Sequence, residues 1–277
     1  MSQPTALSGR PARAAGAAPR SVLPLPLALL GELGLVSLLF ALWRVIGALT
    51  PGQLAAAERR GWALWRAERW LRLPSERGVQ HLVLGHPDLV RVLNVFYLAG
   101  HLGGLAVAAV WLFVWHRPVY LRWRWEVVAV TAVCLVVQFV AVAPPRLVPA
   151  TGMVDTAARY HESAYGVLGG VADQLSSMPS VHVAWAILVA LAVLRAARTR
   201  WRWLVVLHPL ATTFAVVATA NHYWLDAVAA AGVVGLVLAA GRLAVGRRAA
   251  QAAASDRAGR SPVPTSVGSG SPPTAGP

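Results

Sequence analysis

The sequence has no lysine, a single cysteine and few charged residues of either sign. Charged side chains make up 13% of the 277 residues, well below the roughly 25% that is usual in soluble domains. Hydrophobic residues make up 57%, the mean hydropathy is +0.56, and long apolar runs recur along most of the chain. This composition argues against a soluble domain and against a disordered chain, and it indicates an integral membrane protein.

The lone cysteine and the missing lysines also bear on the kind of site. Cys134 has no second cysteine to pair with, so a disulfide within the chain and a cysteine-based metal site are both excluded. All 25 basic residues are arginines, against 11 acidic residues, and the formal net charge is +14. The arginines cluster between the apolar runs, which favours topology signals over nucleic-acid binding. Arginine without lysine, together with abundant alanine, indicates a GC-rich bacterial genome, and hence location in the cell membrane.

Six apolar segments are long enough to span a bilayer, which takes about 20 mainly apolar residues. They are Leu23–Ile46, Leu89–Trp115, Trp125–Ala143, Ser180–Ala197, Trp201–Ala220 and Trp224–Val245. Residues 1–20 are polar and rich in Arg, Pro and Ala, and residues 246–277 lack apolar periodicity, so we expect a disordered arm and a disordered tail. The expected fold is all-α: a polytopic membrane helix bundle of about six transmembrane helices within residues 21–245.

Arginine clusters orient this bundle. With six spans, the N-terminal arm, the second and fourth connections and the C-terminal tail fall on one side, and all four are rich in arginine. The positive-inside rule makes that side cytoplasmic, together with both termini. Residues 47–88 disagree, because they carry six arginines although the alternation of spans places them outside. Their stretch AAAERRGWALWRAERWLRL predicts an amphipathic helix in the headgroup layer.

Three short polar strings lie at the external ends of predicted helices, and polar groups at such depth tend to be functional. They are APPRL (143–147), SSMPSVHVAW (176–185) and TANHYWLD (219–226). His222 and Asp226 are four residues apart, so on a helix they share a face. A carboxylate bonded to one imidazole nitrogen leaves the other nitrogen to act as nucleophile or base. The alternative is an interfacial histidine next to an aspartate that only stabilises a helix N-terminus.

The other two strings supply groups suited to phosphate. Ser180 follows a proline and indicates a helix start, where its side chain caps and the free N–H groups cradle an anion. His182 lies in that first turn, and a nearby phosphate favours its protonated form, which suits a general acid. Arg146 offers planar, bidentate phosphate recognition, whereas alone it would only anchor a helix end. Together these groups favour phosphoryl transfer on a lipid phosphate.

The strings PPRL, MPSVHV and NHYWLD, in this order, resemble the type 2 phosphatidic acid phosphatase superfamily of membrane enzymes. The sequence looks more closely like the branch that contains inositol phosphorylceramide synthase and related inositolphosphotransferases, over residues 94 to 235. The resemblance implies that His222 attacks phosphorus and becomes phosphohistidine. It further implies that Asp226 orients this histidine and that His182 protonates the leaving oxygen.

The resemblance also implies the groups that hold the substrate. Ser180 and Arg146 match phosphate-binding positions of the family. Family members work without a metal, so we expect no metal ligands and no cofactor. Val181 stands where the phosphatases usually have glycine, a change that the inositolphosphotransferase-like branch tolerates better.

Further polar residues near the strings are candidates for a substrate cavity. Asn94, Tyr97 and His101 share one face of the second predicted span, at spacings i, i+3 and i+7. They line the cavity or only form hydrogen bonds between helices. Asn221 and Tyr223, on either side of the expected nucleophile, are further candidates.

The sequence thus predicts a membrane phosphohydrolase or phosphotransferase that acts on a lipid phosphate at the extracytoplasmic side. Water or an alcohol such as inositol can accept the phosphoryl group, and the oligomeric state stays open. One alternative is a metal-dependent membrane oxidoreductase with His182, His222 and Asp226 as a facial triad; another is a non-catalytic membrane scaffold. The leading prediction requires both imidazoles, Asp226 and Arg146 to surround one pocket, with the imidazoles about one phosphate group apart. Its partners are the lipid substrate and membrane lipids, with no nucleic acid.

Overall fold

The computed structural model describes residues 25–49, 53–162 and 174–259. Within these ranges the chain is built from helices, and the only β-type pairing described is an isolated bridge between Val142 and Ser176. The all-α prediction is therefore confirmed. The expected N-terminal arm and the last part of the expected C-terminal tail lie outside the described residues.

Each of the six predicted apolar segments is helical. They form α1 (Leu25–Leu49), then α4 (Pro87–Val95), η1 (Phe96–Gly100) and α5 (His101–Trp115) as one stretch, α6 (Arg117–Val137), α9 (Val181–Ala196), η5 (Arg200–Val206) with α10 (Leu207–Ala218), and α11 (Trp224–Gly259). The connections hold α2 (Leu54–Trp70), α3 (Glu76–Leu84), η2 (Pro145–Leu147), η3 (Pro149–Thr151) and α7 (Thr156–Arg159). Among the described residues, three stretches are long and apolar enough to cross a membrane, namely Pro87–Trp115, Arg200–Ala218 and Trp224–Ser255, and α9 is a shorter apolar helix.

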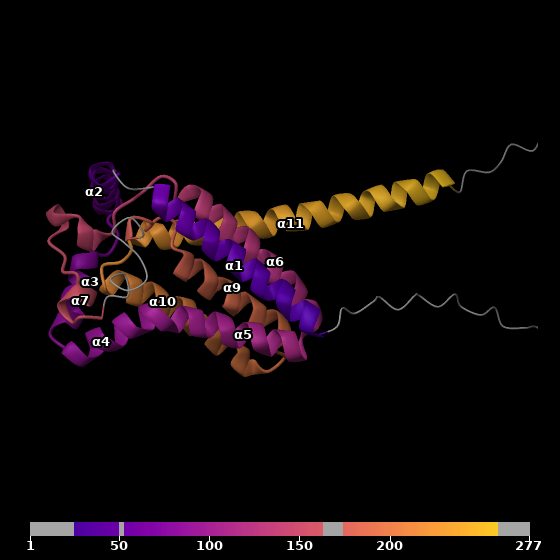
Figure 1. Cartoon of the computed structure of the whole chain (residues 1–277), viewed down its shortest axis with the longest axis horizontal. Coiled ribbons are helices and arrows are strands. Elements are labelled where there is room, and N and C mark those ends of the chain that lie inside the picture. The colour runs from indigo at the N-terminus through magenta and orange to yellow at the C-terminus, as the bar shows by residue number, and fades with distance from the viewer. Residues whose placement is uncertain (1–24, 50–52, 163–173, 260–277) are drawn as a thin grey trace, which may run out of the picture.

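The long helices run side by side along one axis (Figure 1). The helices α2, α3 and α7 gather at one end, and α11 extends beyond the bundle at the other. The core surrounds α9, which packs against α5, α6, α10 and α11. Its buried side chains include Leu112, Val130, Val183, Leu188, Val217 and Val234.

Indole hydrogen bonds fix how α6 lies on α9. The Trp123 Nε1–H donates to the Leu188 carbonyl at 3.0 Å, and the Trp185 Nε1–H donates to Thr131 Oγ1 at 2.9 Å. The outer surfaces of the long helices are apolar instead of polar, with exposed side chains such as Leu30, Leu33, Val107, Val110 and Leu236. An apolar exterior over a bundle that satisfies its backbone internally is typical of a membrane helix bundle.

Helix boundaries differ from the prediction at two places. The predicted third span reached Ala143, but α6 ends at Val137, and the following residues leave the helix to pair with other segments. The Val142 N–H donates to the Leu175 carbonyl, and the Ala143 N–H donates to the Ala57 carbonyl. The expected tail from residue 246 is corrected as well, because α11 continues to Gly259 through alanine-rich sequence, which has strong helix propensity.

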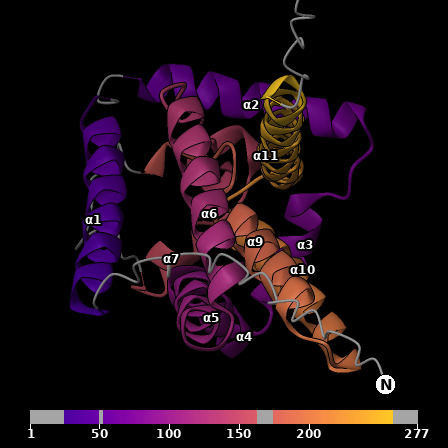
Figure 2. The ribbon, with the colours of Figure 1, turned by 90° about the vertical axis from the view of Figure 1, so that its right-hand side faces the viewer.

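The predicted amphipathic helix is α2, and it lies crosswise over one end of the bundle (Figure 2). Its buried residues are Ala57, Gly61 and Glu68. A Cβ at Gly61 would lie 2.6 Å from the Ala143 carbonyl oxygen and 2.8 Å from the Tyr223 hydroxyl. Glycine is therefore required for α2 to approach the loops at this end of the bundle.

Candidate active site

The turn between α10 and α11 places His222. Ala220 has φ 56°, in the left-handed region that costs about 1–2 kcal/mol for a residue with a Cβ. The N–H groups of Asn221 and His222 both donate to the Val216 carbonyl, at 2.9 and 3.1 Å. This tight closure ends α10 and sets His222 just ahead of the first turn of α11.

Asp226 holds one side of the His222 ring. His222 Nδ1 lies 3.1 Å from Asp226 Oδ2, and the two side chains are 4% and 0% exposed. The same oxygen accepts the Tyr223 N–H at 3.0 Å. The carboxylate thus favours the tautomer with a proton on Nδ1, which leaves the Nε2 lone pair of His222 for chemistry.

His182 faces that second nitrogen. His182 Nδ1 lies 3.4 Å from His222 Nε2, and the ring centroids are 5.4 Å apart. The two rings are therefore closer than the expected separation of one phosphate group, and that prediction is wrong for this structure. The contact gives each of these two ring nitrogens a partner.

Ser180 begins α9 as expected from the sequence. Its hydroxyl accepts the Val183 N–H at 3.4 Å, and its own N–H donates to the Asp226 carbonyl at 3.3 Å. The second contact ties the start of α9 to the start of α11. The two helix N-termini, and with them His182 and His222, consequently meet at one end of the bundle.

Tyr97 and His101 complete an aromatic cluster around His182. The Tyr97 ring stacks on His182 with centroids 4.6 Å apart, and His101 meets it edge-on at 4.2 Å. The π-helical turn η1 contains Tyr97 and ends just before His101, and such turns often mark functional positions. Gly100 permits it, since a Cβ there would lie 2.6 Å from the Phe96 ring.

Asn94 forms hydrogen bonds between helices, which is the second of the two roles expected for it. It accepts the Thr156 hydroxyl at 2.8 Å and donates to Glu162 Oε2 at 2.8 Å. The side chain is 4% exposed. Its contacts therefore tie α4 to α7 and the loop after it.

Arg146 lies beside the turn that carries His222. Its Nε donates to Asn221 Oδ1 at 2.9 Å, and Nη1 donates to Asp155 Oδ2 and Gln174 Oε1, both at 2.8 Å. The Arg146 N–H also donates to the Ala220 carbonyl at 3.1 Å. The guanidinium is held in place by these partners, and Asn221 serves as one of them.

Tyr223 is fully buried beneath the site, where its hydroxyl donates to the Ala143 carbonyl at 3.1 Å. Burial raises the pKa of Tyr223, and the carboxyl groups of Asp226, Glu68 and Glu76 raise it further. The phenol thus stays protonated and acts as a donor that anchors the loop.

Sequence reasoning missed the polar side chains that α2 and α3 bury under the site. Glu68 Oε1 accepts the Leu225 N–H at 2.7 Å, and Gln80 exchanges two hydrogen bonds with the backbone of Val154 at 2.8 and 2.9 Å. Burial is the main reason that the pKa of Glu68 is raised to about 9, and the neighbouring Glu76 side chain is the second. The signal available in the sequence was the spacing of Glu76 and Gln80, which places both on one face of α3.

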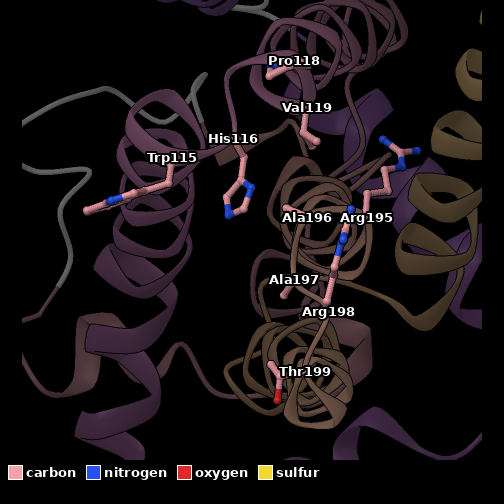
Figure 3. Close-up of a pocket in the computed structure, with 9 residues that line it drawn as sticks. All are labelled: Trp115, His116, Pro118, Val119, Arg195, Ala196, Ala197, Arg198 and Thr199. Carbon is pink, nitrogen blue, oxygen red and sulfur yellow. The ribbon is translucent and has the colours of Figure 1, made fainter.

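Two cavities lie away from this cluster. The larger, of about 720 Å³, lies where α5 meets α6 and α9 ends (Figure 3), and its lining includes His116, Arg195 and Arg198. The second, of about 530 Å³, is lined by residues of α5, α9 and η5 together with His208. Neither lining includes His182, His222 or Asp226.

The side chains of the site do not form a metal centre in the part of the chain that the structure describes. Across residues 25–49, 53–162 and 174–259, no group of three or more His, Cys, Asp or Glu side chains is arranged to hold one. Asp226 and His182 contact opposite nitrogens of the His222 ring. A facial triad needs its three ligands to converge on one point, so this arrangement does not favour the oxidoreductase alternative.

Fold and site together define a membrane helix bundle with a His–His–Asp cluster at one end, in which His222 and Asp226 are buried. The family model of the PAP2 superfamily matches residues 62–240, and the chain belongs to this superfamily. The match covers all three polar strings and confirms the predicted superfamily. Members are phosphatases or phosphotransferases, whereas the inositolphosphotransferase branch stays a prediction. No curated protein and no solved structure matches the chain.

Proposed function

We propose that the protein is a membrane phosphohydrolase or phosphotransferase that acts on a lipid phosphate through a phosphohistidine at His222. The observation that carries the proposal is the contact of His222 Nδ1 with Asp226 at 3.1 Å, which directs Nε2 toward His182. A neutral imidazole oriented by a carboxylate is an activated nucleophile. The family that the sequence resembles works without a metal, which agrees with this arrangement.

The reaction has two steps. His222 Nε2 attacks phosphorus, the bond to the lipid oxygen breaks, and protonated His182 gives its proton to that oxygen. Water or an alcohol then attacks the phosphorus of the phosphohistidine, the bond between phosphorus and His222 Nε2 breaks, and His182 takes the proton of the attacking hydroxyl. Because the two rings contact each other, they must separate when a phosphoryl group enters in front of Nε2.

Charge on the phosphoryl oxygens is stabilised from two directions. Arg146 supplies a permanent positive charge beside the His222 turn, and the first-turn N–H groups of α9 supply partial positive charge after Ser180. Arg146 bonds to Asn221 and Ser180 bonds to Asp226, so both phosphate-binding groups lie at the same end of the bundle as the His222–Asp226 pair. We place this end at the extracytoplasmic side of the cell membrane, following the arginine distribution.

The direct test is His222→Ala, compared with His81→Ala on the exposed side of α3. In detergent or vesicles, His222→Ala should abolish phosphate release or transfer from a panel of lipid phosphates, with and without myo-inositol. The His81→Ala control should keep its activity. Full activity of His222→Ala would reject the mechanism.

The same assay separates the alternatives. Phosphoryl transfer through histidine predicts inhibition by vanadate and indifference to chelators, and it predicts an acid-labile phosphoprotein that His222→Ala lacks. A product that appears only with myo-inositol would favour the inositolphosphotransferase-like branch over hydrolysis. Loss of activity with a chelator, restored by a metal ion, would support the oxidoreductase-type site instead.

A further inference from the structure

Two glutamates lie fully buried behind the His222–Asp226 pair and take no part in the chemistry above. Glu68 at the end of α2 and Glu76 at the start of α3 are both 0% exposed. Glu68 Oε1 accepts the N–H of Leu225, the residue before Asp226, at 2.7 Å. Glu76 Oε2 accepts from Arg69 Nη2 at 2.8 Å.

Each glutamate also has a second carboxyl oxygen. Glu68 Oε2 and Glu76 Oε1 are buried, and no N–H or O–H of the described residues bonds to them. The two carboxyl groups lie close enough for a hydrogen bond between their side chains once one of them carries a proton. Two ionised carboxylates offer only acceptors, so one proton between them is needed to satisfy both oxygens.

The charges around Glu68 favour its protonated form. The groups that face it are Glu76 from α3, Asp226 from α11 and Tyr223 from the turn between α10 and α11. The guanidinium of Arg69 is bonded to Glu76. An ionised Glu68 would place a negative charge in a buried region that already holds the carboxyl groups of Glu76 and Asp226.

We propose that Glu68 and Glu76 share one proton and act as a positioning pair, in which neutral Glu68 holds the N-terminus of α11 through Leu225 and so sets Asp226 against His222. The catalytic part of this inference rests on the proposed function. The link is short, because the Leu225 N–H, the Asp226 carboxyl and the Tyr223 N–H all belong to the same turn. A rigid helix start is what keeps a carboxylate within hydrogen-bond distance of an imidazole.

Substitutions at Glu68 separate positioning from simple packing. In Glu68→Gln the amide oxygen still accepts the Leu225 N–H and the amide N–H donates to Glu76, so the side chain mimics a protonated glutamate. In Glu68→Ala both contacts are lost, and a misplaced helix start should lower kcat by about tenfold to a hundredfold with little change in KM. Glu68→Gln should restore the activity that Glu68→Ala loses. Glu58→Gln, a partly exposed glutamate on the same helix, is the control and should behave like the unsubstituted protein.

The pH profile gives a second readout of activity. The raised pKa of Glu68, about 9, makes it release its proton at alkaline pH, so activity should fall there in the unsubstituted protein. Glu68→Gln has no proton to release and should lose this alkaline decline, while Glu58→Gln should keep it. Equal kcat values and equal pH profiles for all variants, with His222→Ala inactive, would overturn the positioning role and leave the proposed function intact.

Infrared spectroscopy tests the shared proton without any activity. At pH 7 the unsubstituted protein in detergent should show the C=O stretch of a buried protonated carboxyl group, and Glu68→Gln should lack it. The band should disappear as the pH passes about 9. The same band in both proteins, or in neither, would overturn the shared proton. A band that Glu68→Gln removes, with His222→Ala fully active, would show that the proposed function fails while the acid pair stands.

Discussion

At the scale of the residue, His182 is the side chain whose role depends most on the substrate. A general acid is needed when the leaving oxygen is a poor leaving group, as in a lipid alcohol, and is needed little when it is an activated phenol. His182→Ala should therefore lower the rate on a lipid phosphate by about 10² to 10⁴-fold but lower the rate on an activated aryl phosphate far less. Single-turnover rates on the two substrates measure this difference, with His81→Ala as the control. Equal losses on both substrates would contradict the assignment of His182 as the acid.

The raised pKa of Glu68 makes the stability of the fold depend on pH. Its pKa is about 9 when folded against a usual value of 4.5, so between these values the unfolded chain releases a proton that the folded chain keeps. The stability that this proton provides is complete below about pH 4.5 and is lost as pH rises toward 9. Glu68→Gln lacks this titration, so its melting temperature in detergent should fall less between pH 5 and 9 than that of the unsubstituted protein. Glu58→Gln should follow the unsubstituted protein, and a Glu68→Gln slope as steep as that of the control would disprove the linkage.

At the scale of the element, α2 supports the site instead of only covering it. Gly61 lets the helix approach the Ala143 carbonyl and the Tyr223 hydroxyl, and Arg60 Nη1 donates to the Ala141 carbonyl at 2.7 Å. Gly61→Ala should force these segments apart and cost about 1–3 kcal/mol, as overpacking does. Gly85→Ala at the end of α3 is the matched control, because its new Cβ has no atom within 4 Å. Thermal unfolding should show a lower melting temperature for Gly61→Ala alone, and equal values for the two variants would refute the close contact.

At the scale of the whole molecule, the structure explains why arginine counting disagreed over residues 47–88. Arg60 and Arg69 bond to the Ala141 carbonyl and to Glu76, so they stabilise the fold and carry less topological information. The helices pass back and forth along the bundle (Figure 1), and this places α3 at the opposite end from the connection between α9 and η5. The proposed topology therefore rests on the alternation of the helices and not on the arginine count of this one connection.

Cysteine labelling checks the orientation. Cys134 is fully buried, so a membrane-impermeant thiol reagent should leave the native chain unlabelled. His81→Cys on α3 should react in intact cells, whereas Arg200→Cys at the start of η5 should react only after permeabilisation. The reverse pattern would invert the proposed topology, and labelling of both positions in intact cells would disprove the alternation.

The sequence by itself determined the features that depend on local order. Apolar segments were located because spanning a bilayer takes a long uninterrupted run, and their helices appear where the runs are. His222 and Asp226 were paired by a spacing of four residues, and the chain brings them within 3.1 Å. Because hydropathy falls near residue 246, the predicted end of the last helix is too early in the chain. An alanine-rich helix such as the end of α11 continues without an apolar face.

Only the tertiary structure decided which distant groups touch. The contact between His182 and His222 joins residues 40 positions apart, and the bond from Leu225 to Glu68 spans 157 positions. No periodicity in the chain encodes such contacts, because they depend on how the α2 and α3 segments fold over the helix starts of α9 and α11. The same folding removes Glu68 from water, and its environment, not its residue type, decides that it keeps a proton.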